Sequence, residues 1–339
     1  MLFRSRKRVQ DNDGFFQGLR VVGCYEPLSN NPLKILNLYI VKGKDISMMI
    51  DTGFNREDTK EEIIRILKKL NLKFENTILY LTHLHSDHTG LAIFLEKKGM
   101  CTYISKIDGK LLNQSVNKSD SMWQNTIQQS KWQGLEEDAL DIEEHPGFRF
   151  RPLDILNYKE AKPGEKLKIG EYCFEIIDLR GHTPGLTGLY EREHKILFCG
   201  DHILGKITPN ITFWGFEFGD SLGDYFKNLK KVYAMEVEHL FSSHRFLIEN
   251  HRERIDELRK HHEKRLEEAK KALKRFGNVT VRQVAKQMHW DISSKNWGDF
   301  PKSQKWFAAG EAHAHLEHLR ALGIVEIEER DSILYYKLK

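Results

Sequence analysis

The segment THLHSDHTG, residues 82–90, restricts the possible folds of this chain more than any other. It follows the apolar stretch 77–81, which predicts a buried strand, so the segment is expected to be a loop at a strand end. The loop offers three imidazoles and one carboxylate within six residues: His83, His85, Asp87 and His88. Zinc, manganese and iron take these ligands in catalytic sites. The side chains of residues 83 and 85 can point in one direction and those of 87 and 88 in another, so this one loop could supply ligands to two adjacent metal ions.

Further candidate ligands stand directly after three later predicted strands: His182, Asp201 and His244. Each is flanked by Gly, Ser or Thr, which let the backbone approach a site. A single His or Asp at a strand end is usually a cap or a surface residue. Beside the 82–90 loop, however, the three become expected partners, because two metal ions need roughly five to seven ligands.

Two neighbouring residues are predicted to support the ligands. Asp51 ends the apolar strand Ser47–Ile50, where it either caps a turn or hydrogen-bonds a ligand histidine from behind. His202 directly follows Asp201 and is predicted to be structural, not an eighth ligand. Three tryptophans either cover the site or pack an insertion onto the core: Trp123, Trp132 and Trp214.

The chain divides into two parts near residue 249. Residues 1–248 alternate strands with helices, for example the strand Ile35–Val41 and the helix 57–70, and predict a layered α/β sandwich with helices outside. Within this part, residues 106–148 are polar with helical spacing and predict a helical insertion.

Residues 249–339 predict a second, winged-helix-like domain. A charged helix is followed by a short helix near 280–288, a longer helix at 303–322, and two strands that end the chain. Residues 251–339 hold 19 Lys and Arg against 14 Asp and Glu, a balance of +5. A face that binds phosphates should have a larger excess of Lys and Arg over Asp and Glu. Packing on the first domain, or pairing two subunits as a homodimer, is therefore favoured over DNA binding. The histidines at 261, 262, 313, 315 and 318 are predicted to lie at a surface or an interface.

These motifs, in this order, resemble the metallo-β-lactamase-fold hydrolases. The resemblance rests on Asp51-Thr52-Gly53, the 83–88 motif, the segment 181–185, Gly200-Asp201 and Ser243-His244, and it spans roughly residues 30–245. The chain is most similar to the group with a small C-terminal winged-helix-like domain. The resemblance implies an αββα four-layer sandwich with metal ions at one edge, between the sheets. It also implies ligand sets: His83, His85 and His182 for one metal, Asp87, His88 and His244 for the other, and Asp201 bridging them.

The resemblance further implies a hydrolase with two divalent metal ions, expected to be zinc, with manganese or iron as alternatives. A water shared by two cations loses its proton near neutral pH and can attack an acyl or phosphoryl centre, and Asp87 would hold this nucleophile in line. A thioester, ester or lactone is the predicted small-molecule substrate. A metal-dependent nuclease or phosphodiesterase is the second hypothesis, weakened by a net charge of only +4, and a metal-binding DNA-binding regulator is the third. Ser243-His244-Arg245 departs from the Gly-His-Gly setting common in the family, and Arg245 would meet an anionic substrate or face solvent.

The bulk composition fits a globular protein, with 40% hydrophobic and 30% charged residues. No apolar run approaches the roughly 20 residues needed to cross a bilayer, and no apolar stretch follows the basic N-terminus. The four cysteines, Cys24, Cys101, Cys173 and Cys199, form no C-x-x-C and are predicted to be reduced core residues. These features predict a cytoplasmic protein without a membrane partner.

Overall fold

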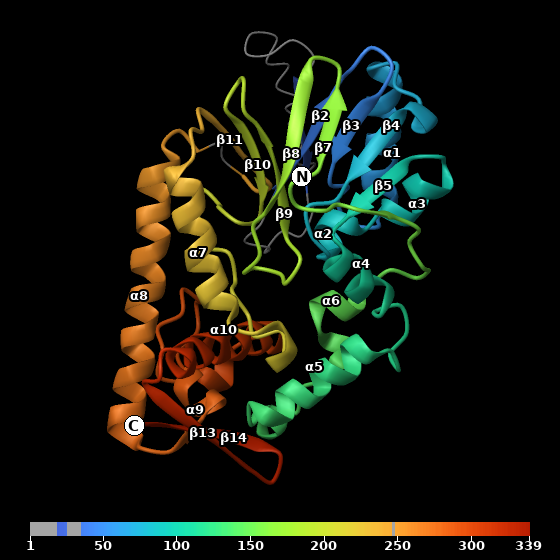
Figure 1. Cartoon of the computed structure of the whole chain (residues 1–339). Helices are drawn as coiled ribbons and strands as arrows, with labels where there is room; N and C mark the ends of the chain where they lie inside the picture. The colour runs from blue at the N-terminus through green and yellow to red at the C-terminus, as the bar shows by residue number, and fades with distance from the viewer. Residues whose placement is uncertain (1–18, 26–34, 246–247) are drawn as a thin grey trace, which may run out of the picture.

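The computed structural model describes residues 19–25, 35–245 and 248–339, which form two facing β-sheets with helices on both outer sides (Figure 1). The first sheet has the order β1-β2-β3-β4-β5-β6. Its strands are Leu19–Tyr25, Ile35–Val41, Ser47–Ile50, Thr77–Tyr80, Cys101–Ile104 and Lys159–Glu160. The second sheet has the order β11-β10-β9-β8-β7. In chain order from β7 to β11, its strands are Lys166–Ile169, Tyr172–Asp178, Thr187–Glu191, Ile196–Gly200 and His239–Ser242.

Strand β2 shows why the first sheet is covered on both sides. Its successive side chains point to opposite faces, and both sets are mainly apolar, with Asn37 the polar exception. Leu38 and Ile40 join the buried cluster that contains Ile63 of α1 (Glu57–Lys69) and Leu95 of α3 (Ala92–Lys97). Tyr39 and Val41 join a different cluster with Phe174, Phe198 and other residues of the second sheet. The predicted layered α/β sandwich is therefore confirmed.

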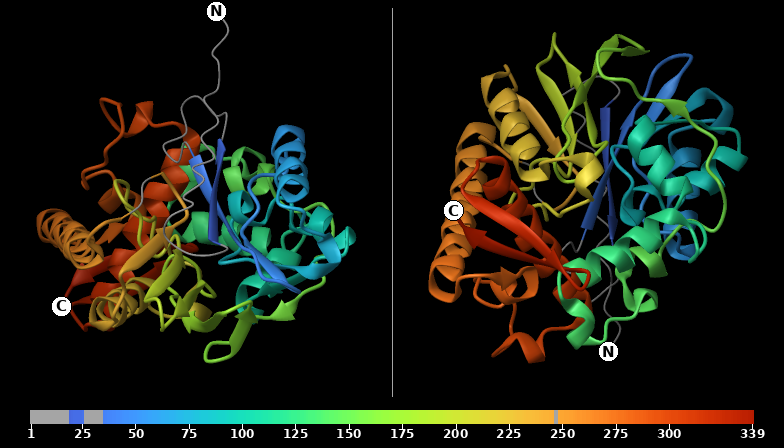
Figure 2. Two further views of the ribbon diagram at one scale, coloured as in Figure 1. Left: turned by 90° about the horizontal axis from the view of Figure 1, so that it is seen from above. Right: turned by 60° about the horizontal axis from the view of Figure 1, so that its bottom comes forward.

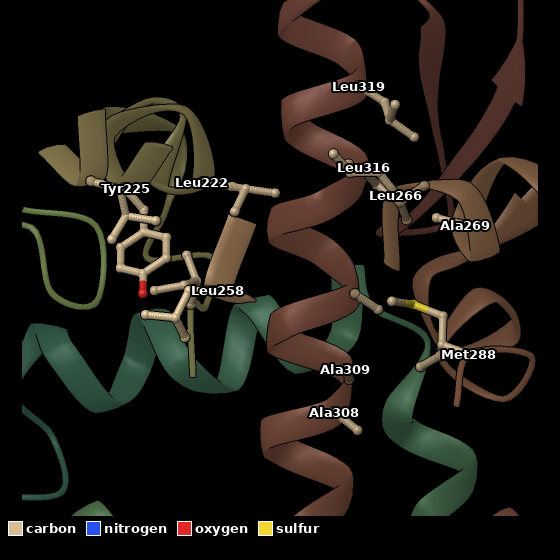
Figure 3. Close-up of a cluster of buried hydrophobic side chains, with 14 of the residues drawn as sticks. Leu222, Tyr225, Leu258, Leu266, Ala269, Met288, Ala308, Ala309, Leu316 and Leu319 are labelled. Carbon is tan, nitrogen blue, oxygen red and sulfur yellow. The ribbon is translucent and has the colours of Figure 1, made fainter. Parts of the chain in front are cut away.

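The outer face of the second sheet packs against helices from both parts of the chain. Leu197 and Leu240 share one buried cluster with α7 (Ser221–Ala234), α8 (His251–Phe276) and α10 (Lys302–Ala321). Figure 3 shows side chains of this cluster, with Tyr225 from α7, Leu258 from α8 and Leu316 from α10. The apolar stripe predicted on the charged helix α8 thus contributes to a core continuous with that of the sandwich.

The C-terminal region has the predicted order of helix, short helix, longer helix and two strands. After α8 come β12 (Val279–Thr280), α9 (Val281–Ala285), α10, β13 (Val325–Arg330) and β14 (Ile333–Leu338). The three strands form an antiparallel sheet of order β12-β14-β13. It is a small helical and antiparallel-sheet region; its winged-helix identity and the boundary near 249 stay predictions.

The segment 106–148 is helical, as predicted, with α4 (Lys106–Asn113), α5 (Ser121–Trp132) and α6 (Pro146–Arg149). It extends away from the sheets and lies beside the C-terminal region (Figure 2). Asp138 ties the two together: it accepts hydrogen bonds from Arg282 Nε at 2.7 Å, Lys305 Nζ at 2.9 Å and Trp297 Nε1 at 2.9 Å.

Several sequence expectations were incomplete or wrong. The seven-residue strand β1 and the short strands β5, β6, β7 and β12 were not predicted; β7 alternates lysine with apolar residues on a sheet edge, a weak signal over four residues. Cys199 is buried as expected, but Cys173 is exposed and Cys101 is half-buried, so the core assignment fails for those two. The side chain of Cys24 lies outside the described residues. Across the described ranges, no helix is long and apolar enough to cross a membrane.

Candidate metal centre

Strand direction explains why residues far apart in the sequence meet at one edge. Strands β3 and β4 are parallel, so Asp51 and the 82–90 loop leave the first sheet on the same side. Strands β8 and β10 are both antiparallel to β9, and β11 is parallel to β10. The carboxyl ends of β8, β10 and β11 therefore share one edge of the second sheet, and these ends carry His182, Asp201 and His244. The two sheets are joined there by Thr187 N, which donates to Thr82 O at 3.0 Å.

Three predicted ligands form a first group of nitrogen atoms. His85 Nδ1 lies 3.0 Å from His83 Nε2 and 2.9 Å from His182 Nε2. All three imidazoles belong to one cluster whose ligand atoms lie within 4.8 Å of one another. This is the set that the family resemblance implied for one metal ion.

A second group forms around Asp87. Its Oδ2 lies 3.4 Å from His244 Nε2 and 3.7 Å from His88 Nε2. The ligand atoms of these three residues also lie within 4.8 Å of one another, close enough to share a metal ion.

Asp201 stands between the two groups. Its Oδ2 lies 3.7 Å from His182 Nε2 and 3.5 Å from His244 Nε2, and its Oδ1 lies 3.6 Å from His88 Nε2. The structure therefore brings all seven predicted residues together, with Asp201 facing both groups.

The positions of these donor atoms suit coordination of a metal ion better than hydrogen bonding between the side chains. His88 Nε2 and Asp201 Oδ1 are buried, and neither has a hydrogen-bond partner among the described residues. Their separation of 3.6 Å exceeds the usual hydrogen-bond length. Buried polar atoms without a partner are costly, and a cation that both atoms could coordinate would remove that cost.

The pKa values in the site follow from burial and from the carboxylates. Burial and the neighbouring His182 lower the pKa of His85 to about 3, and burial lowers the pKa of His83 well below its usual value. Both rings are thus neutral and keep the lone pairs that a ligand needs. Burial also opposes charge on His244, but Asp201 and Asp87 outweigh it and raise its pKa to about 10. The carboxylates therefore create a local potential that favours positive charge.

Asp51 contacts the candidate ligand His88 on the side away from the cluster, which fits one of its two predicted roles. Its Oδ2 lies 2.8 Å from His88 Nδ1, and its Oδ1 accepts a hydrogen bond from Thr82 N at 2.8 Å. The Thr82 hydroxyl lies 3.0 Å from His83 Nδ1. These contacts leave the Nε2 atoms of both histidines directed toward the cluster, the usual arrangement for ligand imidazoles.

His182 is held by a chain of contacts that reaches the C-terminal region. Its Nδ1 lies 2.8 Å from Asn210 O, and the Asn210 side-chain amide donates to Glu311 Oε2 on α10 at 2.9 Å. Glu311 Oε1 in turn lies 3.1 Å from Arg265 Nε on α8. The C-terminal helices thus help to place a candidate ligand.

Asp108 was missed by sequence reasoning. It is fully buried, and its Oδ2 accepts hydrogen bonds from Leu84 N at 3.0 Å and Thr183 Oγ1 at 2.6 Å, while its Oδ1 accepts from Gly185 N at 2.8 Å. Burial raises its pKa to about 7 although these donors oppose the shift. The carboxylate clamps the loop of His83 and His85 to the loop of His182. A Cβ on Gly185 would lie 2.5 Å from Asp108 Oδ1, so the clamp needs a glycine there.

A cavity of about 1430 Å³ opens from the centre, and His85, Asp87, His182 and Asp201 are among its lining residues. The three tryptophans differ in their relation to it. Trp214 stacks on the ring of His85, with centroids 6.0 Å apart, and so lies beside the site. Trp123 is buried in the insertion and also lines the cavity, and Trp132 packs against Phe216.

His202 and Arg245 are not in the cluster. The His202 ring is buried and packs edge-on against Tyr225, at 5.2 Å between centroids, which agrees with the structural role predicted for it. Arg245 is half-buried, with a φ of 64°, and does not line the described part of the cavity.

The C-terminal histidines were predicted at a surface or an interface. His262, His313 and His315 are completely buried and so do not lie at a surface, although His262 packs against Tyr225 and Phe226 of α7, while His261 and His318 are half-buried. His261, His262 and Glu311 lie as close together as the ligands of a metal ion would. However, Arg265 Nε lies 2.9 Å from His261 Nε2 and 3.1 Å from Glu311 Oε1, so a guanidinium already supplies the positive charge there.

Comparison with known proteins decides the family. Residues 33–258 match the family described as the metallo-beta-lactamase superfamily. The chain belongs to this superfamily. Together with the histidine and aspartate clusters, this membership makes the protein a metal-dependent hydrolase of the metallo-beta-lactamase superfamily.

Solved structures of the superfamily share the fold over almost the whole chain. A metallo-beta-lactamase family protein of Thermus thermophilus aligns with a TM-score of 0.76 at 24% identity, covering 95% of this chain and 99% of that one. A beta-lactamase domain protein of Burkholderia ambifaria aligns with a TM-score of 0.75 at 22% identity, covering 95% and 93%. The C-terminal region is therefore largely included in the shared architecture.

Curated relatives cover smaller parts. A Caenorhabditis elegans beta-lactamase-like protein 2 homolog is 26% identical over 78% of this chain and 75% of its own length. The hydroxyacylglutathione hydrolase GloC of Haemophilus influenzae is 32% identical over 42% of this chain and 55% of its own. The human acyl-coenzyme A thioesterase MBLAC2 is 21% identical over 49% and 57%.

Proposed function

We propose that this protein hydrolyses thioesters at a centre of two divalent metal ions, with zinc as the expected metal. The observation that carries the proposal is the pair of three-residue groups facing one another across Asp201 at the head of a large cavity. A single metal ion, held by either group or by the overlapping set of His83, His88 and Asp201, would leave the remaining buried polar atoms of the site without a cation.

The proposed ligand sets follow the two groups. His83, His85 and His182 would hold one ion, Asp87, His88 and His244 the other, and Asp201 would contact both. Bound there, two cations would lower the pKa of a water and polarise the substrate carbonyl.

Residues of the chain itself would orient the attacking water and the ligand rings, and would keep bulk water away from the site. Asp87 is 6% exposed and lines the cavity, so it can accept a hydrogen bond from the attacking water and hold it in line with the carbonyl. Trp214 covers one face of His85 and limits the access of bulk water to that ligand. Asp51 and Asn210 fix the ring orientations of His88 and His182, so less reorganisation is needed during the reaction.

A thioester is favoured over the other substrates for two reasons. Relatives named above act on hydroxyacylglutathione or acyl-coenzyme A, both of which are thioesters. In addition, the cavity exceeds the roughly 300–1,000 Å³ typical of drug-sized ligands, which leaves room for a bulky leaving thiol as well as the acyl group.

Metal content and hydrolysis should be lost together. His83→Ala and Asp201→Ala each remove donors from the cluster, so both variants should hold less metal by elemental analysis and lose nearly all thioesterase activity while circular dichroism stays native. His239→Ala on β11 is the matched control, because it lies on a strand that supplies a ligand but is not part of the cluster.

The assay panel should include acyl-thioesters, hydroxyacylglutathione, a lactone and bis-p-nitrophenyl phosphate. Less than about one metal per chain after reconstitution would refute the dinuclear centre. Faster turnover of the phosphodiester than of every thioester would refute the substrate class and support the nuclease alternative.

A further inference from the structure

The cavity that begins at the candidate metal centre has walls of different chemistry. One set of lining residues comes from the 82–90 loop, the insertion and the segment after β10, and we call it the apolar wall; it consists of Leu84, Leu111, Leu112, Met122, Trp123 and Trp214. The C-terminal region lines the cavity with polar residues, His261, Lys264 and Arg265 of α8 together with His289 and Asp291, and also with Trp306 and Phe307 of α10.

The apolar wall starts at the candidate ligands. Trp214 stacks on His85, and its indole Nε1 donates to His182 O at 3.1 Å. Leu84 lies between His83 and His85 in the sequence, and it packs in the same apolar cluster as Leu112. The wall is thus continuous with the site where the carbonyl carbon would react.

The wall continues into the insertion, which also lines the cavity with polar residues such as Ser115, Thr126 and Gln129. Met122 packs against the cluster of Leu84 and Leu112, and also against the separate cluster of Trp123, Phe148 and Trp306. Both Met122 and Trp306 line the cavity. Met122 and Leu111 are only half-buried, so they present apolar surface that a ligand could cover.

We propose that the substrates are thioesters of an apolar acyl chain, and that this chain lies along the apolar wall while the polar leaving thiol faces α8. This inference rests on the proposed function and names the substrate class within it. A short, hydroxylated acyl group would gain little from six apolar lining residues, whereas each methylene taken from water onto such a wall strengthens binding by up to about fourfold.

The first test is a chain-length series with the metal-reconstituted enzyme. For acyl-coenzyme A substrates from two to sixteen carbons, kcat/KM should rise severalfold with each added pair of methylenes until the wall is filled. Equal or higher kcat/KM for acetyl-coenzyme A or for a hydroxyacylglutathione would overturn the inference.

The second test places bulk on the wall. Met122→Trp should lower kcat/KM for long chains at least tenfold while leaving short chains within about twofold, so that the preferred length becomes shorter. Gln124→Trp is the matched control on the same helix, because Gln124 is exposed and does not line the cavity. An equal loss for all chain lengths in Met122→Trp would count against the wall as the acyl site.

A binding measurement separates this inference from the proposed function. Saturated fatty acids of four to twelve carbons should quench tryptophan fluorescence with a Kd that falls with length, and Met122→Trp should abolish the trend. Length-dependent binding without hydrolysis of any thioester would refute the proposed function and support the apolar wall. Thioester hydrolysis without any length dependence in rate or binding would refute the apolar wall alone.

Discussion

Asp108→Asn should weaken metal binding from a position that touches no metal ligand. The carboxylate receives three hydrogen bonds at 2.6 to 3.0 Å from Leu84, Thr183 and Gly185. All three partners are donors in these contacts, and an asparagine keeps only one acceptor oxygen. Whichever way the amide turns, its NH₂ group faces at least one donor, so one or two bonds are lost.

The expected loss in the free energy of unfolding follows from the cost of these lost hydrogen bonds. A hydrogen bond to a charged group contributes about 1.5–3 kcal/mol, and a buried donor left unsatisfied costs about 1–3 kcal/mol. Removing a buried charge, whose pKa burial has raised to about 7, offsets part of this loss. We expect a net loss of about 2–4 kcal/mol in the free energy of unfolding. Because the loops of His83, His85 and His182 separate when the clamp is cut, metal affinity should fall by roughly 10–100-fold.

The assay is competition for zinc against a chromophoric chelator, with urea unfolding of the metal-free protein in parallel. Asp138→Asn is the control, because Asp138 also accepts three hydrogen bonds but joins the insertion to the C-terminal region instead of the ligand loops. The control should lose stability and keep its metal affinity. If Asp108→Asn loses stability but binds zinc as tightly as the wild type, the clamp does not position the ligands.

Two further predictions follow from residues behind the centre. Asp51→Asn should lower metal affinity and kcat by about 10–100-fold with little change in KM, because His88 loses the carboxylate 2.8 Å from its Nδ1; unchanged zinc competition would contradict this role. For Glu311, burial raises the pKa, but Arg265 together with His261, His315 and His262 outweighs this effect, and the pKa falls to about 2. A carboxyl group whose pKa is lower in the folded than in the unfolded state stabilises the fold. For Glu311 this stabilisation is fully present above pH 4.5 and is lost as the pH falls through about 2. Glu311→Gln should therefore cost about 2–3 kcal/mol at pH 7 and almost nothing near pH 2, measured by urea unfolding; a pH-independent difference between the two proteins would refute the assignment.

The candidate ligand set was predictable because its signal is local. His83, His85, Asp87 and His88 are close in the sequence, and each later candidate lies within four residues of the end of a strand. Their convergence required only that the strands run in the directions that the fold imposes. The layered sandwich was predictable for the same reason, since strands such as Ile35–Val41 carry apolar residues on both faces.

Asp108 could not be found in this way. It lies in the first turn of α4 with Ser105 as the N-cap, a setting in which an acidic residue needs no further explanation. Its partners are 24 to 77 residues away in the sequence, and two of them are backbone amides that no residue type reveals.

The sequence by itself determined most strands of the sandwich, the candidate metal ligands and the superfamily they resemble, because these depend on residue type and on spacing along short segments. Only the tertiary structure decided what surrounds the ligands. The apolar wall, the Asp108 clamp and the contacts from Glu311 through Asn210 to His182 bring together segments up to about two hundred residues apart. Such contacts depend on how complete surfaces pack, and no short stretch of sequence carries that information.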